Sequence, residues 1–432
     1  MTNHQHAADQ HSTDLQRHQQ RPGVLVVGAG LGGLALAHGL RGAGFDVTVV
    51  ERDAHPDARQ QGYRISVNEV GWSALRRLLP PDLFDRLDEV RVRDVGSAFT
   101  FASASAQALL TIPEGPGGGA PTVRRPALRR LLTEGLDVQW GRRVTALTDE
   151  ADGVRVDFED GTTRRVELVV GCDGVRSTVR ETLRGTLAGV DPQRAARVPT
   201  AEAVGYTSIG GHVDRTPGWD RRLPLNTIGG VQYLGPAGSA LFVSFCERDD
   251  GTPAVLWGWS RRSRPDDGDW GERTPDVAVR WRAEAAAAMA DPAWAAALRD
   301  LVSSTPDEAI IEPLVLWTSR IKVGGDLPLH PTGAITLLGD AAHAMPPQRG
   351  LGGNSALADA ASLATGLAEG AGRPLRDVVG DYEREMFRRA GKAVEESVES
   401  AQMFHFRNPV ARAARTVGLR IADRRMRSRR SA

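Results

Sequence analysis

Apolar runs, a glycine turn and a helical segment follow one another near the start of this chain. Val24 to Val27 is an apolar run long enough for a buried parallel strand. A glycine-rich turn, a segment with helical spacing of apolar residues and a second apolar run, Val47 to Val50, come next. Residues 24–53 therefore predict a strand, a tight turn, a helix and a second strand.

The pattern changes twice further along the chain. Alternating strands and helices give way, over residues 191–320, to strands of period two such as Leu241 to Cys246 and Ala254 to Ser260. An alanine-rich helix is expected at about Pro275 to Leu301, and the α/β pattern returns over about 332–403. We therefore expect an α/β protein in which one Rossmann-like domain is split by a mainly antiparallel sheet domain and followed by C-terminal helices.

Composition narrows the classes of protein. The 54 basic and 54 acidic residues give a formal net charge of +0, which argues against a nucleic-acid-binding protein. Cys172 and Cys246 are too few for a disulfide framework and lie in no metal-ligand spacing, so no metal site is expected. There is no apolar run of about 18 residues and no signal-peptide core. We expect a soluble, cytoplasmic protein that does not use a membrane.

The turn after the first strand carries the first chemical motif. Gly28 allows a tight turn, Gly30 lets backbone approach a pyrophosphate, and Gly33 permits close packing of helix on strand. The helix directs its N-terminal amides at the phosphates. Glu51, at the end of the second strand, can accept the hydroxyls of an adenosine ribose and would repel a 2′-phosphate. The unit therefore predicts binding of FAD or NAD.

Two further motifs favour FAD over NAD. The segment 168–180, LVVGCDGVRSTVR, is an apolar strand that ends at Asp173, and 335–354, ITLLGDAAHAMPPQRGLGGN, is a strand that ends at Asp340. Ligands bind at the carboxyl ends of parallel strands, so both carboxylates are placed to meet the cofactor, and a carboxylate can hold the ribitol hydroxyls that NAD lacks. The amides at 352–354 begin a helix and could stabilise the anionic reduced flavin.

These motifs together resemble a known family. The chain is similar to the group A flavoprotein monooxygenases, such as para-hydroxybenzoate hydroxylase, salicylate hydroxylase and the tetracycline-modifying monooxygenases. The resemblance rests on GAGLGG at 28–33, DG at 173–174 and GD at 339–340 with its continuation, and more weakly on VRRPALRRLL at 123–132. It covers about residues 24–400. Arg349 and Leu351 depart from the pattern, since many relatives carry a small residue and Gln there.

The resemblance implies a cofactor, a reductant and a reaction. NADPH or NADH would reduce FAD transiently, O2 would add at flavin C4a, and the hydroperoxide would transfer one oxygen atom to an aromatic or polycyclic substrate. The implied chemistry belongs to the flavin, so no catalytic side chain is assigned. The expected cofactor-binding residues are Gly28, Gly30, Leu31, Gly33, Glu51, Arg52, Arg125, Asp173, Asp340, Pro347, Gly350, Gly352, Gly353 and Asn354.

The inserted sheet is expected to cover the flavin with a dry surface, because water destroys the implied oxygenating species. Strand alternation places Trp257 and Trp259 on one face of a strand, with Phe245 and Tyr233 on neighbouring strands, and these four side chains are candidates for an aromatic substrate pocket. The alternative is that this face packs on the alanine-rich helix as ordinary core. His343 is interpreted as a packing residue with its hydrogen bonds satisfied rather than as an acid or base.

The expected domain boundaries follow from these changes of pattern. Residues 1–22 form a disordered leader. The FAD-binding domain is expected to comprise 23–92, 121–190 and 325–403, and the substrate domain 93–120 and 191–324. Residues 404–432 carry nine arginines and one acid, Asp423, and are expected to form a solvated basic helix partly packed on the FAD-binding domain.

Other functions remain open on the sequence alone. A flavin-dependent reductase or halogenase could use the same fold, although WGWS at 257–260 is not the Trp-x-Trp-x-Ile-Pro signature of flavin halogenases. A non-catalytic FAD-binding protein would keep the flavin anchors and show no substrate-stimulated oxidation of NAD(P)H. We expect an NAD(P)H- and O2-dependent hydroxylase that works as a monomer or homodimer.

Overall fold

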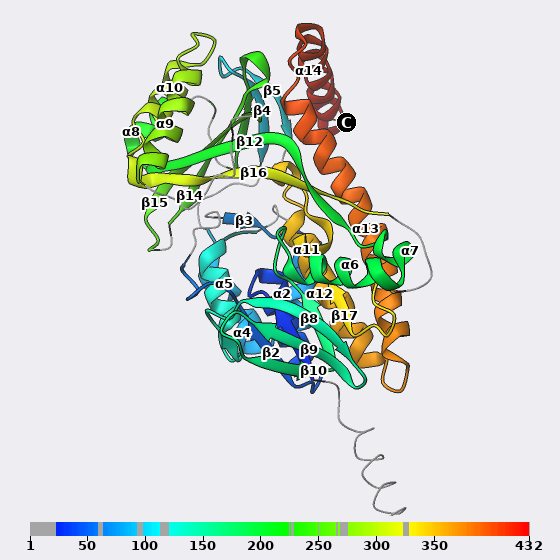
Figure 1. Ribbon diagram of the computed structural model, residues 1–432. Helices are drawn as coiled ribbons and strands as arrows, with labels where there is room; N and C mark the ends of the chain where they lie inside the picture. Colours follow the sequence, from blue (N-terminus) through cyan, green and yellow to red (C-terminus); the bar gives the residue numbers. More distant parts are fainter. Residues whose placement is uncertain are drawn as a thin grey trace, which may run out of the picture.

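The structure is a computed structural model, and it describes residues 23–58, 64–92, 98–112, 121–223, 225, 229–248, 250–264, 267, 275–322 and 328–431. A parallel α/β unit forms its lower part in Figure 1, and a large, mainly antiparallel sheet lies above it. Helix α13 runs from the lower unit to the upper one. The predicted architecture, a Rossmann-like fold split by a sheet and followed by C-terminal helices, is confirmed.

The lower unit is built on five parallel strands, of which the edge strand β7 is half-buried and the other four are buried, as apolar runs with helical crossovers require. In spatial order they are β17 (Ile335–Leu337), β11 (Leu168–Gly171), β1 (Val24–Val27), β2 (Val47–Val50) and β7 (Val138–Gln139). Because β1, β11 and β17 are neighbours, the three loops that follow them meet at one edge of the sheet. These are the loops that carry the three sequence motifs.

Helices and two small sheets surround these strands. The helices are α2 (Leu31–Gly42), α3 (Glu69–Leu78), α4 (Pro81–Asp85), η1 (Arg86–Val90), α5 (Arg125–Thr133), α6 (Thr178–Val190), α7 (Pro192–Ala195), α11 (Asp340–His343), η4 (Pro347–Arg349), α12 (Gly352–Glu369) and α13 (Leu375–Phe404). The small sheets are β3 (Arg64–Ser66) with β6 (Thr122–Arg124), and β8 (Val144–Glu150) with β9 (Gly153–Phe158) and β10 (Thr163–Val166).

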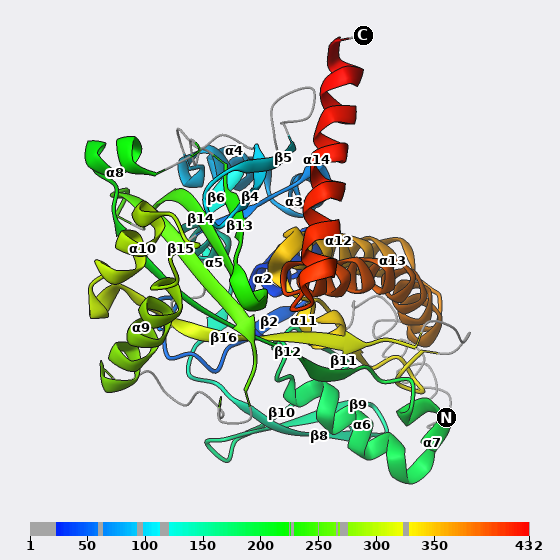
Figure 2. The same cartoon turned by 90° about the horizontal axis from the view of Figure 1, so that it is seen from above.

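The upper sheet has seven strands, and only the pairing of β4 with β13 is parallel. In spatial order they are β16 (Ile310–Arg320), β12 (Thr200–Asp214), β15 (Pro253–Arg262), β14 (Ala240–Glu247), β13 (Val231–Leu234), β4 (Phe99–Ser103) and β5 (Ala108–Ile112). Its other elements are α8 (Pro217–Arg222), η2 (Pro236–Gly238), α9 (Pro275–Met289), α10 (Ala296–Ser303), η3 (Asp307–Ala309) and α14 (Pro409–Ser431). Figure 2 shows α9 and α10 on the outer side of this sheet, away from α11 and α12.

Two expectations about helices are corrected. The alanine-rich helix expected at Pro275 to Leu301 is two helices, because Pro292 lies in a turn between α9 and α10 and cannot donate a helical hydrogen bond. The C-terminal basic helix, α14, packs chiefly on edge strand β5 of the upper sheet, and its Arg415 also donates to the Met403 and Phe404 carbonyls at the end of α13. Asp423 of α14 accepts a hydrogen bond from the Thr111 amide of that strand at 3.2 Å. The division of the chain into domains at the stated boundaries stays a prediction.

Within the described residues, no helix combines the length and apolarity needed to cross a membrane. The same part of the chain contains no cluster of three or more His, Cys, Asp or Glu side chains arranged to hold a metal ion.

Candidate active site

The first motif forms a turn in which each glycine has a separate role. Gly28 has a φ of 110°, and a Cβ there would lie 2.4 Å from the Cys172 carbonyl oxygen. At Gly33 a Cβ would lie 2.3 Å from the Gly28 carbonyl oxygen, so only glycine lets α2 pack this closely on the turn. A Cβ on Gly30, by contrast, would meet no atom within 4 Å. The turn is therefore closed behind Gly28 and Gly33 and open at Gly30.

Glu51 at the end of β2 is bonded to the same turn. Its carboxylate accepts hydrogen bonds from the Ala29 amide at 2.8 Å and from the Asp53 amide at 3.0 Å. Only 6% of the residue is exposed. Arg129 of α5 lies against this carboxylate and against Asp53, with its guanidinium 3.5 Å and 3.2 Å from them. Leu31 is buried in α2, and Arg52 is half-buried beside Glu51.

Asp173 follows β11 and caps the next helix. One carboxylate oxygen, Oδ2, accepts hydrogen bonds from the amides of Thr178 and Val179 at 2.7 and 3.2 Å. The other, Oδ1, is buried without a hydrogen-bond partner among the described residues, and burial raises the pKa of this carboxyl. Arg180 joins this loop to the third motif, since it donates to the carbonyls of Val175 and Ala341 at 2.7 and 3.0 Å.

Asp340 begins α11 immediately after β17. Asp340 is exposed at the surface, but protein surrounds its carboxyl on most sides. This burial raises the pKa of the carboxyl, although the charges of His343 and Arg125 act to lower that pKa. A Cβ built on Gly352 would lie 3.8 Å from Asp340 Oδ1, so the carboxylate lies at the N-terminus of α12. The structure thus brings Arg125 of α5 close to Asp340 and Gly352, which lie more than 200 residues further along the chain.

The loop before α12 is fixed by Asn354. Its side-chain amide donates to the carbonyls of Ser66 and Gly350, both at 2.9 Å, and its carbonyl accepts from the Asn68 amide at 2.9 Å. The Asn354 side chain is therefore engaged with protein. The groups at the start of α12 that a ligand can reach are the backbone amides. Gly350 is left-handed, with φ 64°, and both it and Pro347 are exposed.

His343 has a buried carboxylate partner. Its Nε2 lies 2.5 Å from Asp359 Oδ2, and Arg389 donates to Asp359 Oδ1 at 2.7 Å. Burial acts to lower the pKa of His343, but the Asp359 carboxylate outweighs this and the pKa is raised. His343 thus ties α11 to α12 and α13 below the loop, and it lies within the protein rather than at an open surface.

These features fit the flavin dinucleotide that the motifs predict. A Cβ at Gly30, Gly174 or Gly350 would meet nothing within 4 Å, so the three loops leave open space at one sheet edge. The unpartnered Asp173 Oδ1 needs a hydrogen-bond donor, which a ribityl hydroxyl supplies. When bound, FAD supplies the redox and oxygen chemistry, and these residues would bind and orient it.

The four aromatic pocket candidates lie elsewhere. Tyr233, Phe245, Trp257 and Trp259 are at most 3% exposed and belong to a hydrophobic core together with Trp281 of α9. This corrects the expectation that they line a substrate pocket. Their common face of the sheet packs on α9 and α10, and Trp257 donates to Thr305 at 2.8 Å from within that core.

The opposite face of the sheet turns toward the parallel unit. Phe242, Gly258 and Gly210 form one cross-strand row on it, and all three are half-buried. Arg64 of β3 reaches this face, where it donates to the Phe245 carbonyl at 3.1 Å and stands 5.9 Å from the centre of the Phe242 ring. Burial lowers the pKa of Arg64 to about 10. Figure 1 shows β3 directly beneath the sheet.

A polar group lies beside this row, at Ser260. His405, at the end of α13, donates from Nδ1 to the Ala401 carbonyl at 2.6 Å, so its Nε2 accepts from the Ser260 hydroxyl at 2.9 Å. The Tyr206 ring stacks on His405 with centres 4.3 Å apart. We call Tyr206, Ser208, Gly210, Phe242, Leu256, Gly258 and Ser260 the inner face of the sheet.

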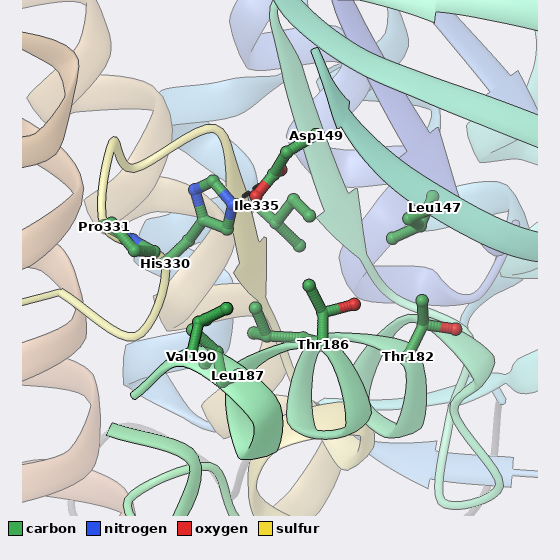
Figure 3. A pocket seen from close by; sticks show the side chains of 10 residues that line it. Leu147, Asp149, Thr182, Thr186, Leu187, Val190, His330, Pro331 and Ile335 are labelled. Carbon is green, nitrogen blue, oxygen red and sulfur yellow. Dashed lines mark hydrogen bonds and ion pairs between the residues drawn. The ribbon is translucent and has the colours of Figure 1, made fainter. Parts of the chain in front are cut away.

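A separate hollow lies between α6, β8 and the start of β17 (Figure 3). Its walls are mostly apolar, with the His330–Asp149 pair on one side and Thr182 and Thr186 on the other. Its only residue from the three motif segments is Ile335, at the start of the third, and it includes no residue of the inner face. Since the hollow contains neither the glycine turns nor Asp173 or Asp340, the three loops and the inner face are the candidate active site.

Comparison with known proteins agrees with this geometry. The model of one protein family, described as FAD binding domain, matches residues 21–207 and 268–397, which is more than half of the chain. The chain belongs to this family. It is an FAD-dependent monooxygenase of the group A flavoprotein type.

Similar proteins share this assignment. The FAD-dependent monooxygenase thnD of Trichoderma harzianum is 29% identical over 393 residues, which are 87% of this chain and 92% of the relative. Rifampicin monooxygenase of Rhodococcus hoagii is 39% identical over 168 residues, 38% of this chain and 33% of the relative. Among solved structures, a protein from Photorhabdus luminescens assigned as an FAD-containing monooxygenase superposes with a TM-score of 0.73 at 27% identity, over 89% of this chain and 98% of its own.

A further solved structure supports the fold alone. The 2,6-dihydroxypyridine-3-hydroxylase of Arthrobacter nicotinovorans superposes with a TM-score of 0.69 at 20% identity, over 89% of this chain and 93% of its own.

Several residues of the site escaped the sequence analysis. Arg129 lies in a segment with four arginines between 123 and 132, and nothing in the pattern singles out the buried one. The inner face was missed because large aromatic residues drew attention to the other side of the same strands. The alternation of Gly210 and Gly258 with bulky neighbours was the available signal, because a glycine in a strand indicates a close approach.

Proposed function

We propose that this FAD-dependent monooxygenase uses NADH or NADPH and O2 to hydroxylate an aromatic or polycyclic small molecule that lies against the inner face of the sheet. The observation that carries the proposal is the half-exposed row of Phe242, Gly258 and Gly210 facing the unit that holds the three motifs. The missing side chain of Gly258, where a Cβ would meet only the Ser208 hydroxyl at 3.8 Å, leaves open surface beside an aromatic ring, which suits a planar substrate.

The proposed cofactor contacts are those the motifs indicate. Glu51 would hold the adenosine ribose, the open backbone at Gly30 and the start of α2 would meet the pyrophosphate, and Asp173 and Asp340 would face the ribityl chain and phosphates. Arg125 would balance their negative charge. The amides of Gly352 and Gly353 would lie beside the flavin ring at the N-terminus of α12, where a helix favours negative charge.

The proposed substrate class draws on the names of similar proteins. Rifampicin monooxygenase and 2,6-dihydroxypyridine-3-hydroxylase are each named for a ring compound. In this chain the Ser260 hydroxyl, held by His405, offers an oxygen that can accept a hydrogen bond from a substrate hydroxyl. Tyr206 and Phe242 offer ring surfaces on the same inner face.

Turnover tests this function against a reductase and against an inert flavin-binding protein. The purified yellow protein is incubated with NADH or NADPH, and oxidation is followed across a panel of phenols, salicylates and polyketides. We expect slow oxidation alone and clear stimulation by a suitable ring compound, with one oxygen atom added to that compound. Peroxide production at an unstimulated rate across the whole panel would refute the hydroxylase.

We also propose that the protein acts in the cytoplasm as a monomer or homodimer. Light scattering of the purified protein measures its mass, and a trimer or larger assembly would contradict this proposal. Fractionation of the producing cells tests the compartment.

A further inference from the structure

Arg129 occupies an unusual position for an arginine. It lies in the second turn of α5, only 6% exposed, and its guanidinium contacts two other segments, the glycine turn and the stretch at the end of β2. Nε donates to the Ala29 carbonyl at 2.9 Å, one terminal nitrogen donates to the Pro56 carbonyl at 2.8 Å, and the other donates to Asp53 at 3.2 Å. That second nitrogen also lies 3.5 Å from Glu51.

These contacts converge on the glycine turn. The peptide at Ala29 is fastened on both sides, because its amide donates to Glu51 at 2.8 Å and its carbonyl accepts from Arg129 at 2.9 Å. Ala29 stands between Gly28, where the chain turns, and Gly30, where the backbone is open to a ligand. The orientation of the open backbone at Gly30 is therefore set by a network that includes Arg129.

The same network sets the charge at the end of β2. Glu51 and Asp53 are 6% and 7% exposed, and two buried carboxylates this close repel each other unless a cation lies against both. Arg129 lies against both of them. Its planar guanidinium can hold two carboxylates and a carbonyl at fixed angles, which a lysine ammonium cannot do. The Trp140 ring, 5.2 Å from the guanidinium, packs on it.

We propose that Arg129 is a positioning residue for the adenosine end of FAD: it holds the Glu51 carboxylate and the Ala29 peptide in the geometry that binds the ribose and the pyrophosphate. The inference rests on the proposed ribose contact of Glu51. In the alternative, the ion pair only stabilises α5 against β2, and FAD would bind equally well without it.

The chain offers a matched control in the next residue. Arg130 lies on the same helix and also pairs with an acid, Asp57, at 2.5 Å, but both of these side chains are exposed. Arg129→Met and Arg130→Met each remove one charge from α5 and keep an unbranched side chain. Since breaking a buried ion pair is costly whereas an exposed pair contributes little, only the first is expected to affect the site.

FAD retention by the holoenzyme is the measurement. Each variant is diluted in steps, and the free flavin that passes an ultrafiltration membrane gives the dissociation constant. We expect Arg129→Met to raise it by roughly tenfold or more and Arg130→Met to leave it within about twofold of the parent. Equal retention by Arg129→Met and Arg130→Met would overturn the proposal. If Arg129→Met is insoluble, Arg129→Lys is compared with Arg130→Lys, and equal retention there would overturn it as well.

A double-mutant cycle separates positioning from simple stability. If Arg129 acts through Glu51, the combination of Glu51→Gln with Arg129→Met should retain FAD no more than about twofold worse than Arg129→Met alone. Independent, multiplying effects would overturn the proposal. No effect of Glu51→Gln alone would refute the ribose contact, and this inference with it, without touching the assignment as a monooxygenase. Failure of the hydroxylase proposal would instead appear in turnover, while FAD retention stayed as expected.

Discussion

Glu383 of α13 gives a prediction whose size can be worked out from the structure. Its carboxyl is 3% exposed and accepts hydrogen bonds from the Leu329 amide and the Thr336 hydroxyl, both at 2.7 Å. Leu329 lies before β17 and Thr336 lies in it, and this strand leads to Gly339 and Asp340. Glu383 therefore fastens α13 to the segment that delivers the third motif.

Burial raises the pKa of Glu383 from 4.5 to about 7. Between these two values the folded protein holds a proton that the unfolded chain has lost, so the contribution of this group to stability is full below about pH 4.5 and is lost as the pH rises through 7. A shift of this size corresponds to about 3 kcal/mol at 1.36 kcal/mol per pKa unit. The carboxyl should thus make the protein less stable at pH 8 than at pH 5.

Glu383→Gln tests this reasoning. The amide is neutral at both pH values, its oxygen can accept from Leu329, and its NH2 group can donate to the Thr336 hydroxyl. Urea unfolding of the parent and the variant at pH 5, 6, 7 and 8 gives the difference in free energy of unfolding, in which the effects of other titrating groups cancel. We expect this difference to move in favour of the variant by about 2 to 3 kcal/mol between pH 5 and pH 8. A difference that stays constant over that range would refute the reasoning.

Three substitutions test the active site itself. Asp340→Ala should weaken FAD retention by at least about tenfold while the melting temperature falls little, and unchanged retention would show that the carboxylate does not face the cofactor. Gly353→Asp should abolish turnover by placing negative charge beside the reduced flavin. Gly353→Ala is its control, because any Cβ at this position meets Ile65 at 2.3 Å. Equal activity of the two variants would show that the negative charge is not what matters. Gly258→Leu should fill the inner face and weaken substrate binding by roughly 10- to 100-fold with FAD retained, since a Cβ there meets only the Ser208 hydroxyl at 3.8 Å; normal substrate binding would place the substrate elsewhere.

The parallel unit was predictable because its signals are local. The run Val24 to Val27, the glycines after it and Glu51 follow one another within 30 residues. At Gly28 and Gly33 the structure shows directly why a side chain is excluded, since a Cβ would lie 2.4 and 2.3 Å from backbone oxygens. The ends of β11 and β17 were equally clear, because an apolar run followed by an acid and glycines gives both the strand and its boundary.

The inner face was harder to predict because strand alternation does not tell which of two faces meets the flavin. Trp257 and Gly258 are neighbours in sequence and point to opposite sides of the sheet. The choice between them depends on α9 and α10, whose packing against the tryptophans is a long-range event. The same limit explains α14: its arginines suggested solvent, whereas Leu419 and Ala422 pack against the core at β4 and β5.

Partners of buried ionic groups were also outside the reach of the sequence. His343 was interpreted as a packing residue with its hydrogen bonds satisfied. The structure does bury it, but its Nδ1 has no hydrogen-bond partner among the described residues, and nothing in the pattern indicated that Asp359 would pair with its Nε2. Arg129 likewise gains its role from segments that are 73 to 100 residues away along the chain.

The most direct test of the whole account is oxygen incorporation by the purified holoenzyme. The protein is supplied with NADPH or NADH, isotopically labelled O2 and the ring compound that most stimulates oxidation, and the product is analysed by mass spectrometry. The account predicts released FAD on denaturation and one labelled oxygen atom in each product molecule. Unlabelled substrate recovered unchanged, with all of the label in hydrogen peroxide for every compound tried, would contradict it.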